Sequence, residues 1–177
     1  MMLNIGSGNS MVGDVRLDIY DLPNVTHTAD VVKEGIPFKD NHFDDILCDC
    51  VYEHMKDPHK FLKECNRVLK PGGKMKLLTD NAGYLIFHVR ARHGDYVDGT
   101  GGDKGKDRHY ALYTREHLQN HFMQADFEVN RIDYVMLGGV TGFRKVKRWS
   151  IQKLIWLFFG ERVGYPRLDC EVTKPIK

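Results

Sequence analysis

The most constraining feature of this chain is an apolar run that ends in two glycines and precedes a second apolar run that ends in an acid. Residues 3–8 are Leu-Asn-Ile-Gly-Ser-Gly, and residues 15–18 are Val-Arg-Leu-Asp. Glycine lets the backbone turn sharply and approach a ligand with no side chain in between. An acid at the end of the neighbouring parallel strand can accept hydrogen bonds from ribose hydroxyls. The pattern predicts a nucleoside site at the first turn of an open α/β sheet.

Apolar runs and helical patterns alternate along the chain. Asp57 and Pro58 suit the cap and first position of a helix over residues 58–69, and Lys-Pro-Gly-Gly at residues 70–73 suits its end. A second helix is expected to begin near Thr114 and to end at about residue 124. Strands are expected at residues 2–5, 15–19, 28–32, 44–50, 73–79, 127–136 and 168–173. This alternation predicts one domain with a mostly parallel sheet and helices on both of its faces.

The four cysteines, Cys48, Cys50, Cys65 and Cys170, include no Cys-x-x-Cys pair, and no histidine lies beside them at zinc-ligand spacing. We therefore expect no metal site. Cys48 and Cys50 alternate along one face of an expected core strand, and free thiols fit a reducing compartment. No stretch is typical of a signal peptide or a membrane span, so a cytoplasmic location is expected.

Charge is distributed unevenly. Residues 1–60 contain 11 acids and 5 bases, whereas residues 136–167 contain 7 bases and one acid. A basic region can bind an anionic partner, although a solvated charged face is the commoner explanation. Residues 94–107 contain five glycines and many charges, which predicts a mobile loop that closes over the substrate side of the site.

Residues 143–159 combine basic side chains with two tryptophans and a nearly continuous apolar run. Such a segment can pack against the fold, form a homodimer contact, lie on a membrane surface or hold an acidic substrate. We favour packing or dimerisation, and we expect Leu154, Ile155 and Phe158 to be buried.

Three further segments resemble a known family. Residues 35–47 contain Ile-Pro-Phe-Lys-Asp and Phe-Asp-Asp-Ile, residues 51–58 are Val-Tyr-Glu-His-Met-Lys-Asp-Pro, and residues 64–73 are Glu-Cys-Asn-Arg-Val-Leu-Lys-Pro-Gly-Gly. Their order resembles the class I S-adenosylmethionine-dependent methyltransferases, and within them the type 11 group. The resemblance implies a Rossmann-like, doubly wound, mostly parallel seven-stranded sheet with an antiparallel last strand.

Two departures from the family pattern suggest a compact version of this fold. Six residues, 9–14, separate the Gly-x-Gly turn from the second strand where the family has a helix, and no helix precedes the first strand. We expect a single domain over residues 1–177. Residues 1–80 would form its cofactor-binding half, and residues 81–177 its substrate-side half, with the 94–107 loop and the 143–159 helix.

The resemblance also implies the cofactor, S-adenosyl-L-methionine, and the residues that hold it. Asp18 would accept hydrogen bonds from the ribose hydroxyls, and Asp30, at the end of the third strand, would face the adenine amino group. The full set of expected cofactor-binding residues is Asn4, Gly6, Ser7, Gly8, Asp18, Ile19, Asp30, Val31, Cys50, Val51 and His54. His54 and His109 are the candidate catalytic bases, because histidine titrates near neutral pH.

The implied activity is transfer of a methyl group to an oxygen, nitrogen or carbon of a small molecule. Two alternatives remain open: a cofactor-binding partner subunit without catalysis, and an RNA-directed enzyme that uses the basic late segment. Cys-Asp-Cys-Val at residues 48–51 stands where enzymes that methylate the amino groups of nucleic-acid bases have Asp/Asn-Pro-Pro-Tyr. A nucleic-acid acceptor is therefore not expected, and the sequence does not identify the small molecule.

Overall fold

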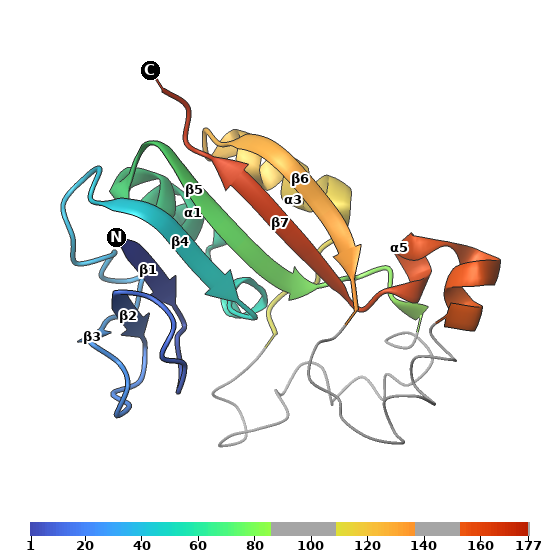
Figure 1. The fold of residues 1–177 in the computed structure, drawn as a ribbon, viewed down its shortest axis with the longest axis horizontal. Helices are drawn as coiled ribbons and strands as arrows, with labels where there is room; N and C mark the ends of the chain where they lie inside the picture. The colour runs from blue at the N-terminus through green and yellow to red at the C-terminus, as the bar shows by residue number, and fades with distance from the viewer. Residues whose placement is uncertain (86–108, 137–152, 177) are drawn as a thin grey trace.

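A computed structural model describes residues 1–85, 109–136 and 153–176, and these residues build one seven-stranded sheet (Figure 1). The strands are β1 (Met2–Ile5), β2 (Val15–Asp18), β3 (His27–Thr28), β4 (Phe43–Asp49), β5 (Leu69–Asp80), β6 (Glu128–Val135) and β7 (Arg167–Thr173). Their order in the sheet is β3-β2-β1-β4-β5-β7-β6.

The strand directions confirm the expected fold class. Strands β1 to β5 pair in parallel, and β7 is antiparallel to both β5 and β6. From β1 the chain moves outward to β2 and β3 and then returns to place β4 on the other side of β1. In sheets of this kind ligands bind outside the carboxyl ends of the strands where the strand order reverses. That point lies between β1 and β4.

The two long described helices begin where the sequence predicts. In α1 (Pro58–Val68) the Asp57 side chain accepts a hydrogen bond from the Lys60 N–H at 2.9 Å. In α3 (Arg115–Gln124) the Thr114 hydroxyl accepts one from the His117 N–H at 3.3 Å. These caps satisfy amide groups that have no partner in the first helical turn. Shorter helices are η1 (Tyr52–His54) and α5 (Glu161–Gly164), and residues 153–159 are also helical.

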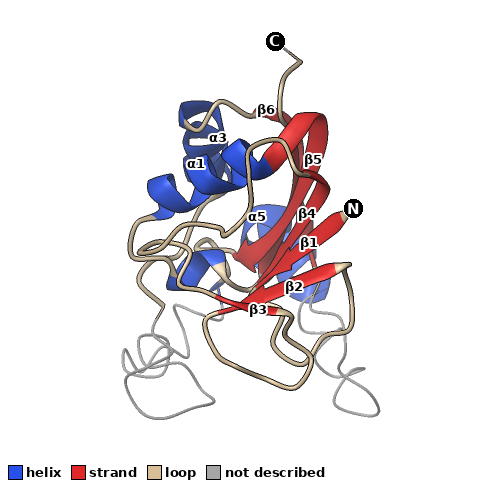
Figure 2. Ribbon diagram, turned by 90° about the vertical axis from the view of Figure 1, so that its left-hand side faces the viewer, coloured by secondary structure: helices blue, strands red, loops and turns tan. Residues whose placement is uncertain are grey.

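Helices α1 and α3 contact each other and lie on the same face of the sheet (Figures 1 and 2). The core lies between them and the inward strand residues, which include Leu3, Ile46, Met75, Leu77 and Cys170. The opposite face is polar, because the outward positions of β5 and β7 are charged. Examples are the Lys74–Glu171 and Lys76–Asp169 ion pairs at 3.3 and 3.4 Å. The expectation of helices on both faces is thus met on one face only in the described part of the chain.

Three local features differ from the sequence prediction. Strand β3 has only two residues, so Asp30 lies in the turn that follows it and not at its end. The Lys-Pro-Gly-Gly segment belongs to β5, where pairing jumps from Phe43↔Leu69 to Asp45↔Lys74 and the intervening residues bulge. Strand β4 ends at Asp49, so Cys50 lies beyond it and outside the core. The connection over residues 9–14 is a loop, as expected.

The expected packing of the late helix against the sheet is wrong, whereas its burial in a dimer contact stays a prediction. Leu154 and Phe158 are 56% and 73% exposed, and Ile155 is partly exposed. The prediction assumed an uncovered apolar sheet face, whereas that face is charged and needs no cover. Residues 143–152 and the 94–107 loop lie outside the described residues.

In the described ranges, no helix combines the length and the apolar character that crossing a membrane requires.

Candidate functional site

The Gly-x-Gly turn after β1 has the geometry that glycine permits. Gly6 and Gly8 have φ angles of +64° and +52°. A Cβ on Gly6 would lie 2.1 Å from Cγ2 of Val51, so no larger residue fits without movement. A Cβ on Gly8 would meet nothing within 4 Å. The turn therefore packs closely against the segment after β4 and leaves open space beside Gly8.

Asp18 is the last residue of β2 and is held next to this turn. Its Oδ2 accepts a hydrogen bond from the Gly8 N–H at 2.8 Å, and its Oδ1 accepts one from the Tyr20 N–H at 3.0 Å. The residue is only 6% exposed. A carboxylate has about four acceptor positions, so these two bonds orient the group and leave capacity for two hydroxyls.

Asp30 lies on the opposite wall, in the turn after β3. Its Oδ1 accepts hydrogen bonds from the N–H groups of Val32 and Lys33, both at 3.1 Å, and its Oδ2 lies 2.9 Å from Lys33 Nζ. Partial burial opposes ionisation of this carboxyl, but the hydrogen bonds and charge of Lys33 hold its pKa below the usual value. Asp30 is therefore an ionised acceptor at neutral pH.

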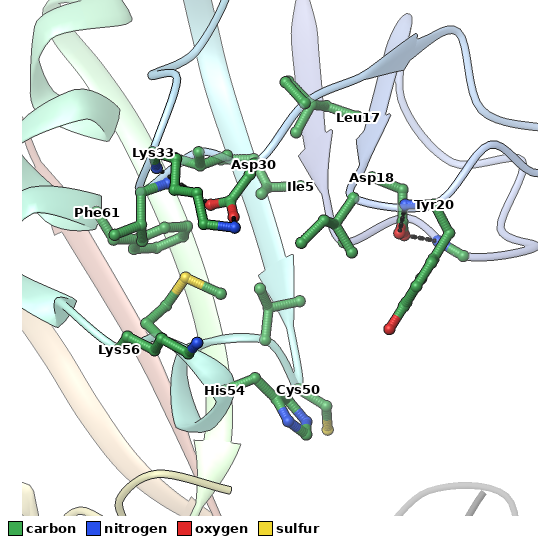
Figure 3. A pocket seen from close by; sticks show the side chains of 18 of the residues that line it. Ile5, Leu17, Asp18, Tyr20, Asp30, Lys33, Cys50, His54, Lys56 and Phe61 are labelled. Carbon is green, nitrogen blue, oxygen red and sulfur yellow. Dashed lines mark hydrogen bonds and ion pairs between the residues drawn. The ribbon is translucent and has the colours of Figure 1, made fainter. Parts of the chain in front are cut away.

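These groups surround a pocket of about 590 Å³ at the point where the strand order reverses (Figure 3). The volume lies in the usual range of small-molecule sites. Nearly all the expected cofactor-binding residues line it: Gly6, Gly8, Asp18, Ile19, Asp30, Val31, Cys50, Val51 and His54.

Asn4 and Ser7 are not among the lining residues. The Asn4 side chain is buried and donates a hydrogen bond to the Val12 carbonyl at 3.0 Å, which anchors the loop between β1 and β2. Ser7 is also buried, and its N–H donates to the Leu17 carbonyl at 3.2 Å. Both residues support the turn from behind the pocket.

Sequence reasoning missed several lining residues, including Tyr20, Lys33, Lys56 and Tyr110. Tyr20 comes two residues after Asp18, and its 48% exposure is unusual for a large aromatic side chain. An aromatic residue two positions after a ribose-binding acid was a signal that could have identified it. Tyr110 could be placed only by the fold, because its N–H donates to the Glu53 carbonyl at 2.7 Å across more than fifty residues of sequence.

The segment after β4 forms the floor of the pocket. Cys50 has a φ of +55°, and its N–H donates to the Leu78 carbonyl at 2.9 Å. Burial raises the pKa of the Cys50 thiol well above its usual range, so the thiol is neutral and weakly nucleophilic. Figure 3 shows Cys50 and His54 together at one edge of the pocket, away from Asp18 and Asp30.

The structure brings together the two candidate bases. The ring centroids of His54 and His109 lie 4.5 Å apart, and the two rings meet edge to face. Beneath them Glu53 is 1% exposed, and its Oε2 accepts a hydrogen bond from the Thr79 hydroxyl at 2.8 Å. Burial raises the pKa of Glu53, and burial together with the Glu53 charge raises that of Asp80. Of the two histidines, His54 lines the pocket and His109 does not.

Comparisons with known proteins agree with this geometry. A methyltransferase domain model matches residues 9–77. Over 163 residues the chain is 28% identical to a ubiquinone/menaquinone biosynthesis C-methyltransferase of Vibrio campbellii, covering 81% of this chain and 57% of that protein. The protein of the same name from Cronobacter sakazakii is 30% identical over 126 residues, covering 63% of this chain and 49% of the relative. The chain thus spans about half the length of the curated relatives it matches.

Solved structures show the same fold at low sequence identity. A SAM-dependent methyltransferase from Archaeoglobus fulgidus has a TM-score of 0.66 at 14% identity, covering 98% of this chain and 85% of that one. A phosphoethanolamine N-methyltransferase from Haemonchus contortus, in complex with phosphomonomethylethanolamine and S-adenosylhomocysteine, has a TM-score of 0.60 at 18% identity. That match covers 99% of this chain and 48% of the other.

Proposed function

Since this chain belongs to the class I S-adenosylmethionine-dependent methyltransferases, we propose that it binds S-adenosylmethionine in this pocket and transfers the methyl group to a small molecule. The observation that supports this most directly is the convergence of the Gly6–Gly8 turn, Asp18 and Asp30 on one pocket where the strand order reverses.

The residues present fit the cofactor. Asp18 would accept hydrogen bonds from the two ribose hydroxyls. It would use the acceptor positions that remain after its hydrogen bonds with the Gly8 and Tyr20 N–H groups. Asp30 would accept a hydrogen bond from the adenine amino group, and Ile19 and Val31 would lie against the adenine ring. The open space beside Gly8 would allow the ligand to approach the backbone closely. Cys50, Val51 and His54 would then lie nearest the sulfur.

S-adenosylmethionine supplies a methyl group that is already activated by a positively charged sulfur. The protein's main task is therefore positioning, because the nucleophile must be held about 3 Å from the methyl carbon and in line with the leaving sulfur. The floor after β4 would support the sulfur, and His54 at the edge of the pocket faces the side from which an acceptor would enter. His54 or His109 would remove a proton from an oxygen or ammonium nucleophile.

The similar proteins are named for different methyl acceptors. The similar sequences are named for carbon methylation in quinone biosynthesis, while a similar structure carries a phosphoethanolamine N-methyltransferase name. Acceptor choice in such folds depends on loops and late helices more than on the sheet. We propose a small-molecule acceptor and a cytosolic enzyme, the latter supported by four free cysteines.

The test is binding of the demethylated product, S-adenosylhomocysteine, measured by calorimetry. Wild-type protein should show saturable binding, and Asp18→Ala should weaken it at least about tenfold, because a hydrogen bond to a charged group contributes about 1.5–3 kcal/mol. Asp21→Ala is the matched control, since Asp21 is an exposed acid three residues away. Equal affinities for the two variants would place the ribose elsewhere, and no binding to the wild type would refute the proposal.

Turnover is then measured as release of S-adenosylhomocysteine with a panel of phenols, quinols, amines and carboxylic acids. Release with any member supports an enzyme. Tight product binding with no release on any acceptor would favour the cofactor-binding subunit.

A further inference from the structure

A cluster of potential metal ligands lies at the edge of the pocket. Glu53, His54 and His109 each offer one ligand atom, and these atoms all lie within 4.8 Å of one another. Two imidazoles and a carboxylate form the donor set of many zinc and non-haem iron sites. We propose that Glu53, His54 and His109 bind one divalent transition metal ion. The inference concerns metal binding itself and does not require the proposed methyl transfer.

The spacing is close to that of a metal site. Ligands at about 2.1 Å from a tetrahedral metal lie roughly 3.4 Å from one another. Because the atoms of this cluster already lie within 4.8 Å, small side-chain rotations would bring them to the required separation. The backbone holds the two segments together, since the Tyr110 N–H donates to the Glu53 carbonyl at 2.7 Å.

Local charge favours a cation. Glu53 belongs to the cluster, and the Asp80 carboxylate lies next to His109. The Arg167 guanidinium lies 3.9 Å from Asp80. One guanidinium does not balance two carboxylates. A bound dication would offset the excess negative charge.

The groups behind the ligands suit a metal site as well. The Thr79 hydroxyl donates to Glu53 Oε2 and orients the carboxylate, which keeps further acceptor capacity. Asp80 Oδ2 lies 3.9 Å from His109 Nδ1. A carboxylate behind a ligating histidine typically orients the ring through one nitrogen and leaves the other for the metal. In this arrangement Nε2 of His109 would be the ligand atom.

With three protein ligands the ion would keep an open position. His54 also lines the cofactor pocket, so that position would lie at the pocket's edge. If the proposed function is correct, the open position would bind an oxygen of the methyl acceptor and lower its pKa, and this role would replace proton removal by a free histidine. This consequence rests on the proposed function, whereas metal binding can be measured without cofactor or acceptor.

The experiment uses the full chain, stripped of metal with a chelator and titrated with cobalt(II) and zinc(II). We expect one ion per chain by calorimetry and visible absorption bands typical of cobalt bound to imidazole. His54→Ala, His109→Ala and Glu53→Gln should each weaken zinc binding at least about tenfold. Glu53→Gln keeps the size of the side chain and an acceptor for Thr79, so it tests the anionic ligand with little change in packing. His59→Ala is the control, because His59 is exposed and lies outside the cluster.

Circular dichroism of all variants and S-adenosylhomocysteine binding by His109→Ala separate metal loss from unfolding. Wild-type protein that binds no zinc above the level of its cluster variants would overturn the inference. So would an equal loss of zinc binding in His59→Ala, which would assign the ion to surface histidines. If product binding persists in either case, the proposed function stands and only the metal site is refuted.

Discussion

Gly6 and Gly8 have nearly the same backbone conformation but different surroundings. A side chain at Gly6 would collide with Val51, whereas one at Gly8 would enter open space in the pocket. The first glycine is therefore required by packing, and the second matters chiefly where a ligand approaches. This difference can be measured with two matched substitutions.

Gly6→Ala should lower the free energy of unfolding by about 2–4 kcal/mol, since a left-handed alanine and an overpacked contact both cost energy. Gly8→Ala should lower it by only about 1 kcal/mol but should weaken S-adenosylhomocysteine binding. Urea unfolding and calorimetry measure the two effects. Adding Val51→Ala to Gly6→Ala should recover the contact part of the loss. Equal destabilisation by the two single variants would contradict the packing difference.

At the residue scale, the sequence predicts well what depends on neighbours along the chain. The glycine turn and Asp18 lie within fifteen residues of one another, and both border the pocket. Asp30 also lines the pocket, although the strand before it is shorter than expected. Its carboxylate accepts hydrogen bonds from the N–H groups of Val32 and Lys33, and these local bonds turn the chain out of the strand. Tyr110 could not be predicted, because its place depends on a contact with Glu53 that only the fold creates.

At the scale of elements, Arg67 explains why two of the family-like segments occur together. From α1 it donates hydrogen bonds to the carbonyls of Ile36 and Phe38, each at 2.8 Å. It also pairs with Glu64, whose carboxylate accepts the Ile36 N–H at 2.8 Å. The guanidinium thus fastens the loop before β4 to the helix after it. These motif residues are structural, although they helped to identify the family.

Arg67→Ala should lower the free energy of unfolding by about 2–3 kcal/mol, because several carbonyl and carboxylate groups lose a charged donor. Arg67→Lys should not restore the loss, since an ammonium cannot match the planar fork of the guanidinium. Lys63→Ala is the control, and its exposed pair with Asp126 should contribute less than about 1 kcal/mol. Chemical denaturation would reveal the contrast, and similar losses for Arg67→Ala and Lys63→Ala would contradict it.

Substitutions in the late helix over residues 153–159 should change stability little, unlike those at Arg67. Replacing exposed Leu154 and Phe158 with Asp should change stability by no more than about 0.5 kcal/mol each. Leu62→Asp, at a fully buried position on α1, should unfold the protein, because it puts a charge into the core. Thermal unfolding and light scattering give the stability and the oligomeric state. A large loss of stability or a change of mass in the double variant would mean that the helix is covered by a second copy.

At the scale of the whole molecule, most of the sheet could be predicted from apolar runs bounded by Gly, Pro and Asp. The charged face could have been predicted as well, because Lys74 and Lys76 alternate with apolar residues as a half-solvated strand requires. We instead assumed an uncovered apolar sheet face, and that error led to the wrong prediction that the late helix packs against it. The position of β7 between β5 and β6 did not follow from any local pattern. The family resemblance implied only that the last strand is antiparallel.

That position has a consequence for how the chain is made. Strands β1 to β5 can pair with one another as they leave the ribosome, although one edge of β5 stays open until β7 is made. Strand β6 then appears with its described neighbour, β7, still unmade. At about 5–20 residues per second, the gap of some thirty residues keeps β6 waiting for a few seconds. During that interval both edges of the strand are open to other chains. The risk of nascent-chain aggregation, and the demand for a chaperone, therefore extend beyond the time at which strands β1 to β5 have formed their part of the sheet.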